Sequence, residues 1–409
     1  MQMYKGVPII TNKHPIEERE GVPHYVMNHI GWDEKYFIHR FRKEALAKIN
    51  EIHSRKKTPI IIGGTHYYLN SLIFNNKTIE TNENKQNSDS NIEVEGKGQL
   101  SKDMVDILNG PPEIIYQTLL SKDPKIAGKF HPNDTRRVRR ALEIIFLTNK
   151  KTSEHYSEQL ESVTNESSLN FNTLAFWVYS EKSILDKRLD DRVDKMLDNG
   201  GMDEIKELYY YYSSLPERPD CERGIWQVIG FKEFLPWLES GLSDDKLLKQ
   251  SIIDMKTRTR QYAKRQIKWI KSLLAVDLLK ESKHGYTNGG KLYLLDATDL
   301  KNWDDNVFQR GALITNDFLQ NKACTIDQTP DTLRNMLPKE ENTRDNEDKS
   351  TEWKHIKCEV CFNNDNSPLI LIGDNQYKIH LNSKRHRSNL NRGKRKRDYE
   401  AWLAKNESK

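Results

Sequence analysis

Four residues in the last quarter of the chain have the types and the spacing of a zinc site. Cys358 and Cys361 are separated by two residues, His380 and His386 by five, and eighteen residues lie between the pairs. Two thiolates and two imidazoles are the ligand set of a closed, tetrahedral structural Zn²⁺ site. A chance coincidence is the alternative, and the sequence SKRHRSNL around His386 argues against it.

The spacing of the two histidines is not compatible with a regular helix between them. Residues six apart point about 120° away from each other on a regular helix, so binding one metal ion requires a distorted turn between them. Asn382 and Ser383 are poor helix formers that would provide this turn. The pattern resembles the U1C/matrin type of zinc finger.

Basic residues crowd the second histidine and the segment after it. They are Lys384, Arg385, Arg387, Arg392, Lys394, Arg395, Lys396 and Arg397. A metal-stapled module with this charge predicts binding to a nucleic-acid phosphate backbone. The run RGKRKR also resembles a nuclear-localisation patch, and RNA contact would produce the same composition.

The composition is that of a multidomain protein from a reducing compartment. The chain has 409 residues, with 65 Lys and Arg against 60 Asp and Glu. This length predicts two or three domains. Two of the four cysteines form the Cys-x2-Cys pair, which indicates metal binding rather than a disulfide framework. No apolar run approaches the roughly 20 residues of a membrane span, and no signal peptide is evident at the first residues.

Three short apolar runs predict strands of a parallel α/β sheet. Residues 60–62 form a β-branched run before Gly63 and Gly64, and are expected to be a buried strand. Thr65 would then lie at the carboxyl end of that strand, where such sheets bind ligands. Alternatively, Thr65 merely caps the following turn. Further strands are expected at 173–179 and 291–299.

Three helices follow from apolar periodicity. The first is expected to begin at Asn133 or Asp134 and to end at Thr148, with Val138, Leu142 and Ile145 facing the core. Its four N-terminal arginines oppose the helix dipole and therefore predict an anionic partner. A second helix precedes Gly200-Gly201 and buries Leu185, Leu189, Val193 and Met196. A third covers 251–273 and carries seven cations: Lys256, Arg258, Arg260, Lys264, Arg265, Lys268 and Lys271. These cations are explained equally well by contact with RNA and by an ordinary solvent-exposed face of the helix.

Six motifs in one order resemble the tRNA dimethylallyltransferase (tRNA isopentenyltransferase) family over about residues 1–275. They are GVPHYV, IIGGTHYYLN, HPNDTRRVRRALEI after a DP pair, RLDDRVDKML, GIWQVIGFKEF and TRTRQYAKRQIKWI. Eukaryotic members add the C-terminal finger. The resemblance implies an α/β, P-loop-kinase-like parallel sheet with a helical tRNA-binding insertion at about 71–135. A linker at 321–350 and a small zinc finger with a basic tail at 351–409 would complete the chain.

The family transfers a dimethylallyl group from dimethylallyl diphosphate, with Mg²⁺, to N6 of the adenine 3′ to the tRNA anticodon. By this resemblance Thr65 lies near the substrate, Arg192 binds the diphosphate, and Gln2 helps to read the flipped adenine. The tRNA-contacting stretch matches Arg136, Arg137, Val138, Arg139 and Arg140. From the residues alone, Arg188 and Arg192 could instead pair with Asp191 and Asp194 on a solvated face.

The chain departs from the family at its first residues. The motif G-x-x-x-x-G-K-[ST] does not occur, and MQMY resembles the last four residues of the family motif DSMQ(V/M)Y. The aspartate of that motif, the expected general base, would precede Met1. We therefore expect a late start or a fragment that binds tRNA without modifying it. The alternatives are a genuine truncated, non-catalytic RNA-binding protein and a spliceosomal finger protein. The protein is expected in the cytoplasm, and the sequence also leaves nuclear and mitochondrial locations as alternatives.

Overall fold

The chain divides into two compact units. The computed structural model describes residues 1–75, 100–284, 289–338, 353–363 and 366–392. The core unit comprises Met1–Lys77 and Glu166–Glu340, and the helical–finger unit comprises Thr78–Asn165 and Glu341–Lys409. The helical insertion, expected at about 71–135, therefore extends to Asn165. The finger belongs to the same unit as this insertion.

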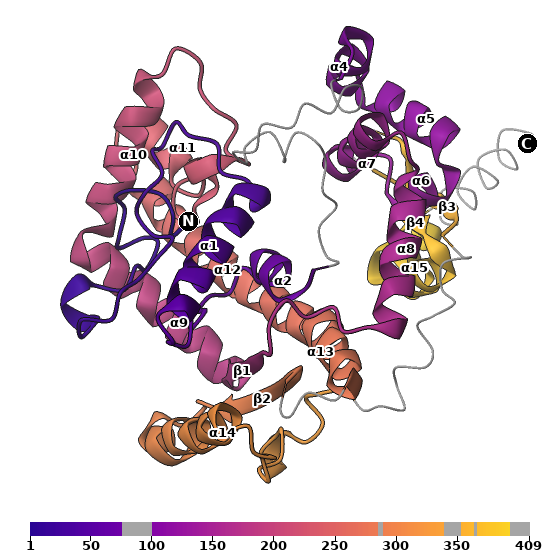
Figure 1. Cartoon of the computed structure of the whole chain (residues 1–409). Coiled ribbons are helices and arrows are strands. Elements are labelled where there is room, and N and C mark those ends of the chain that lie inside the picture. The colour runs from indigo at the N-terminus through magenta and orange to yellow at the C-terminus, as the bar shows by residue number, and fades with distance from the viewer. Residues whose placement is uncertain (76–99, 285–288, 339–352, 364–365, 393–409) are drawn as a thin grey trace, which may run out of the picture. The chain divides into compact units, whose positions relative to one another are not determined.

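The core unit is an α/β structure rich in helices. Its elements are α1 (Ile38–Ser54), α2 (His66–Ile73), β1 (Leu174–Tyr179), α9 (Lys182–Met196), α10 (Met202–Ser214), α11 (Leu235–Glu239), α12 (Asp245–Trp269), α13 (Ala275–Glu281), β2 (Lys291–Asp296) and α14 (Arg310–Leu319). Strands β1 and β2 pair in parallel, from Leu174 opposite Lys291 to Tyr179 opposite Asp296 (Figure 1). The two strands expected at these positions are confirmed.

Helices α9 and α12 pack together and form the frame of the core unit. Leu189, Val193 and Met196 are buried as their spacing predicts, and Gly200 ends this run with a φ of +102°. Helix α12 begins six residues earlier than expected because Asp244 caps it, accepting hydrogen bonds from the amides of Lys246 and Leu247. Among the described residues, no helix is long and apolar enough to cross a membrane.

The strand expected at residues 60–62 is not formed. The segment belongs to no sheet, and Ile60 and Ile62 are 82% and 87% exposed. A β-branched run becomes a buried strand only when a neighbouring strand supplies its hydrogen bonds and an apolar face. In the described part of the chain, β1 and β2 pair only with each other. The high β-propensity of residues 60–62 is therefore not sufficient to form a strand here.

The segment expected to be a linker is in part a component of the core unit. Leu333, Met336 and Leu337 pack against the apolar cluster around the parallel strands. The amide of Leu294 donates to the carbonyl of Gln328 at 2.8 Å. Residues 321–338 are thus held on the core, and 339–350 lie outside the described residues. Lys394, Arg395, Lys396 and Arg397 also lie outside the described residues.

The described part of the helical–finger unit combines seven helices with a small β-hairpin. Its elements are α4 (Lys102–Asn109), α5 (Pro112–Lys122), α6 (Pro124–Lys129), α7 (Thr135–Thr148), α8 (Thr152–Asn165), β3 (His355–Phe362), β4 (Pro368–Ile372) and α15 (Gly373–Leu381), and a further helix covers 384–392. Asp134 caps α7 through the amide of Arg137 at 3.2 Å. The predicted stripe of Val138, Leu142 and Ile145 is buried.

Candidate metal centre and functional site

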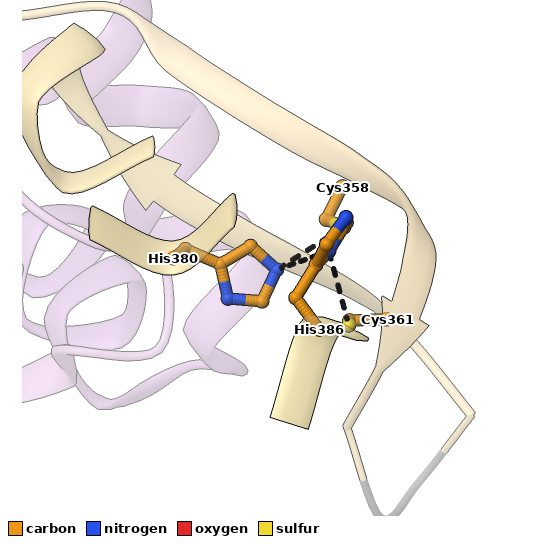
Figure 2. A group of neighbouring side chains, drawn as sticks. All are labelled: Cys358, Cys361, His380 and His386. Carbon is orange, nitrogen blue, oxygen red and sulfur yellow. Dashed lines mark hydrogen bonds between the residues drawn. The ribbon is translucent and has the colours of Figure 1, made fainter. Parts of the chain in front are cut away.

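The four predicted metal ligands converge on one point in the helical–finger unit (Figure 2). The ligand atoms of Cys358, Cys361, His380 and His386 all lie within 4.8 Å of one another. His380 Nε2 is 3.1 Å from His386 Nδ1 and 3.3 Å from Cys358 Sγ. His386 Nδ1 is 3.5 Å from Cys358 Sγ and 3.6 Å from Cys361 Sγ. Tetrahedral zinc would place nitrogens about 3.3 Å apart and nitrogen about 3.6 Å from sulfur, so the observed separations fit the ion.

A bulge in β3 brings both cysteines to the same side. Residues three apart on a regular strand point to opposite faces of the sheet. The pairing register of β3 and β4 shifts between Lys357 and Phe362, and Cys358 and Cys361 are both buried. The Cys-x2-Cys spacing therefore requires this irregularity.

The distorted turn predicted between the histidines is confirmed. Helix α15 ends at Leu381, and a second helix begins after Ser383. The amide of Ser383 donates to the carbonyl of His380 at 2.9 Å, and the hydroxyl of Ser383 accepts from the amide of His386 at 3.1 Å. Ser383 thus closes one helix and caps the next, which directs both imidazoles inward.

The electrostatics of the four ligands favour a bound cation. Burial raises the pKa of the Cys361 thiol, and burial followed by the neighbouring His386 lowers the pKa of His380. Neutral imidazoles are ready ligands, and a divalent ion would stabilise the thiolates that burial disfavours. Asn389 Nδ2 donates to Cys361 Sγ at 3.4 Å. This hydrogen bond, which the sequence does not predict, helps to hold the Cys361 sulfur in position for a metal ion.

In the core unit, Thr65 faces the long helix α12. Thr65 occupies the N-cap position of α2, but its side chain accepts no capping hydrogen bond. Its Oγ1 lies 3.4 Å from the hydroxyl of Tyr262 on α12. The capping alternative is therefore wrong, and the hydroxyl is exposed for a ligand. Sequence reasoning does not single out Tyr262, because a contact across 197 residues leaves no local signal.

The residue after Thr65 is fixed by an aromatic stack. The His66 ring lies 4.7 Å from that of Trp269, at an interplanar angle of 7°. His66 is buried, its ring nitrogens have no hydrogen-bond partner among the described atoms, and burial lowers its pKa. A neutral, stacked His66 anchors the start of α2 and with it the position of Thr65.

The two arginines of α9 have different environments. Arg188 donates to the carbonyls of Ala297 and Thr298, each at 2.7 Å, and so ties α9 to the end of β2. Arg192 is exposed and has no hydrogen bond or ion pair with any described residue. Protein nevertheless surrounds its guanidinium closely enough for burial to lower the pKa of Arg192. A desolvated cation without an acid is suited to an anionic ligand.

Two acidic residues near Arg192 form ion pairs with cations of α12. Lys256 Nζ is 2.6 Å from Asp194 Oδ1, and Arg260 forms an ion pair with Asp190. Pairing of Asp194 with Arg188 or Arg192, the alternative from sequence, is wrong. Further along α12, Lys264, Arg265 and Lys268 are exposed and have no ion-pair partner within the described ranges.

The arginines of α7 are partly satisfied within the protein. Arg137 pairs with Asp134, Arg139 donates to Asn109 Oδ1 at 2.9 Å, and Arg140 lies 2.6 Å from Glu143. Arg136 is exposed and has no ion pair with a described residue. Val138, expected in the tRNA-contacting stretch, is 1% exposed. That expectation is wrong for its side chain, because the same face of the helix forms the core.

The structure holds Gln2 by one end of its amide. Gln2 Nε2 donates to the carbonyl of Thr11 at 2.7 Å, and Oε1 is buried with no partner among the described atoms. No hydrogen bond or ion pair between described residues joins Gln2, Thr65 and Arg192. Their proximity to one substrate thus remains a prediction.

Comparison with known proteins gives one consistent family. The model of the family described as IPP transferase matches residues 2–273. The tRNA dimethylallyltransferase of Saccharomyces cerevisiae is 48% identical over 98% of this chain and 87% of its own length. That of Schizosaccharomyces pombe is 35% identical over 98% and 90%. A crystal structure of a eukaryotic dimethylallyltransferase acting on tRNA aligns with a TM-score of 0.81 at 48% identity, covering 98% of this chain and 91% of that one.

Proposed function

Because the chain belongs to the IPP transferase family, we propose that it transfers a dimethylallyl group from dimethylallyl diphosphate to tRNA. The acceptor is N6 of the adenine 3′ to the anticodon. The observation that carries the proposal is the 48% identity to the S. cerevisiae tRNA dimethylallyltransferase over 98% of the chain. The fold agreement with a eukaryotic enzyme acting on tRNA supports it.

Arg192 is proposed to bind the diphosphate of the donor. Its neighbouring carboxylates are paired with α12, so its charge is free for an external anion. A guanidinium matches phosphate oxygens with two parallel hydrogen bonds. It would stabilise the negative charge that grows as pyrophosphate leaves, which is the main electrostatic demand of the reaction. Mg²⁺ would accompany the diphosphate and share in neutralising it.

Thr65 and Gln2 are proposed to contact the reacting groups. The Thr65 hydroxyl is exposed beside Tyr262, and its position is fixed by the His66–Trp269 stack. Gln2 Oε1 is buried and has no partner among the described atoms, so it would accept from an amino group once the amide turns toward the base. An adenine presents both an amino donor and ring acceptors, so an amide in this position suits the recognition of a flipped base.

The basic surfaces are proposed to hold the tRNA. Lys264, Arg265 and Lys268 of α12 are exposed cations without acidic partners in the described part of the chain. Arg136 adds a similar charge at the start of α7. Cations in such places neutralise phosphates and release counterions, so they contribute affinity without sequence specificity.

The finger is proposed to bind one Zn²⁺ through Cys358, Cys361, His380 and His386. The buried donor set and its separations support this ion. A module of this size has too small a hydrophobic core to fold without a metal ion or a disulfide. The bound metal would therefore supply much of its folding free energy.

The test is transfer of labelled dimethylallyl from its diphosphate to tRNA, measured for the purified chain and for a version extended at its N-terminus with the family's G-x-x-x-x-G-K-[ST] loop and aspartate, neither of which is expected in the chain itself. Transfer by the extended version that requires both substrates and is lost in Arg192→Ala supports the proposal. Binding of tRNA without transfer by either version at any donor concentration would instead favour the alternative of a non-catalytic RNA-binding protein.

A further inference from the structure

The first residue of β3 holds the finger against the helices of its own unit. His355 Nε2 lies 2.9 Å from the carbonyl oxygen of Phe130. His355 Nδ1 lies 3.3 Å from the hydroxyl of Tyr116 on α5, and the two rings are stacked with centroids 6.0 Å apart. In Figure 1, β3 lies beside α5 and α6.

The partners of His355 fix the form of its ring. A backbone carbonyl only accepts, so Nε2 carries the proton and donates it to Phe130. In the neutral imidazole Nδ1 is then an acceptor, and the Tyr116 hydroxyl donates to it. Burial raises the pKa of Tyr116, which keeps this hydroxyl protonated. Both nitrogens of a neutral imidazole are thereby satisfied.

A second contact lies beside the first and depends on a glycine. A Cβ placed on Gly128 in α6 would stand 2.7 Å from the carbonyl oxygen of Trp353, two residues before His355. That distance is well inside van der Waals contact, and the obstructing atom belongs to the backbone. Only a residue without a side chain lets α6 approach the finger this closely.

The two contacts connect the metal centre to the start of α7. Strand β3 carries His355 as well as the ligands Cys358 and Cys361. On the other side, the ring of Phe130 lies under the guanidinium of Arg137, 5.4 Å from centroid to carbon. Arg137 in turn pairs with Asp134, the cap of α7.

We propose that His355 is a latch that docks the metal-bound finger onto α5–α7, so that metal loading orders the start of α7 and its arginines. The finger is then part of one RNA-binding body and not an independent tethered module. The latch itself stands on contacts within this unit. Only its consequence for RNA rests on the proposed function.

Three single variants separate docking from folding of the finger. His355→Asn keeps an acceptor near Nδ1 and removes the Nε2 donor, whereas His355→Gln places an amide donor where Nε2 stands. Gly128→Ala is expected to favour α6 as an isolated helix and yet to obstruct docking, so damage to α6 itself cannot explain an effect.

The experiment is hydrogen–deuterium exchange of the full chain, with zinc content measured in parallel. The expected result is roughly 2- to 10-fold faster exchange of amides over 124–137 in His355→Asn, from the net value of one hydrogen bond. Gly128→Ala is expected to match or exceed this, and His355→Gln to stay near wild type. Zinc content should remain stoichiometric in all three. Unchanged exchange over 124–137 in both His355→Asn and Gly128→Ala would overturn the latch.

Chelation tests the coupling directly. Removing the metal from the wild-type protein should raise exchange over 124–137, and the same treatment of His355→Asn should add little. Equal protection of this segment with and without metal would contradict the inference. Binding of an anticodon stem-loop RNA is measured on the same samples. If the stem-loop fails to bind while exchange responds as expected, the proposed function is refuted and the latch stands.

Discussion

Arg192→Ala should separate catalysis from stability. Arg192 has no acidic partner among the described residues, and burial lowers its pKa. The charge of Arg192 is therefore expected to destabilise the folded state slightly, if it changes the free energy of folding at all. The variant is expected to melt at the wild-type temperature or slightly above. Its kcat/KM for dimethylallyl diphosphate should fall about 100- to 1000-fold, by analogy with the loss of one preorganised donor to a developing negative charge.

Two further variants identify what Arg192 supplies. Arg192→Lys keeps the charge and loses the planar fork, so it should recover only part of the lost rate. Lys187→Ala removes an exposed cation from the same helix and should leave the rate unchanged. Steady-state transfer at saturating tRNA, with tRNA affinity measured separately, is the assay. Near-normal turnover of Arg192→Ala, or equal losses in both alanine variants, would show that Arg192 is an ordinary surface charge.

Four other perturbations test the remaining parts of the site. Thr65→Val should lower transfer without lowering the melting temperature, since its hydroxyl caps no helix; a lower melting temperature with normal transfer would assign it a structural role. Lys264→Ala and Lys268→Ala should each reduce the log–log salt slope of tRNA binding by roughly 0.7 to 0.9, and an unchanged slope would exclude phosphate contact. Burial lowers the pKa of His66, so the unfolded chain binds its proton more readily and stability falls as pH drops below about 6.5. His66→Phe should keep the stack and reduce the loss of melting temperature between pH 7 and 5; an identical loss would contradict this. Cys358→Ser should abolish stoichiometric zinc and weaken tRNA affinity but not transfer at saturating tRNA, and retained zinc would refute the ligand assignment.

The sequence predicted the elements that have a clear local pattern of spacing or periodicity. The metal ligands, the cap and core stripe of α7 and the strands β1 and β2 follow from spacing and periodicity, and the structure has them. Even the turn at Asn382 and Ser383 could be predicted, because two histidines six apart cannot otherwise reach one ion.

The remaining features depend on partners that are distant in sequence. The 60–62 run reads as a strand, but it has no neighbour to pair with in the described structure. Val138 falls within a motif of arginines, yet helix periodicity turns it toward the core. The hydroxyl pair of Thr65 and Tyr262 joins residues 197 positions apart, and His355 contacts Tyr116 and Phe130 across 239 and 225 positions. No periodicity or spacing marks such pairs before the fold is known.

The central claim is that this chain modifies one adenine of tRNA, and mass spectrometry tests it most directly. Purified protein, extended at its N-terminus with the family's G-x-x-x-x-G-K-[ST] loop and aspartate, is incubated with dimethylallyl diphosphate, Mg²⁺ and a tRNA transcript. The transcript is then digested to nucleosides and to mapped fragments. The account predicts N6-dimethylallyladenosine at the position 3′ to the anticodon, and none in a transcript with guanine there. Unmodified adenine at that position after complete tRNA binding, or modification at another site, would contradict it.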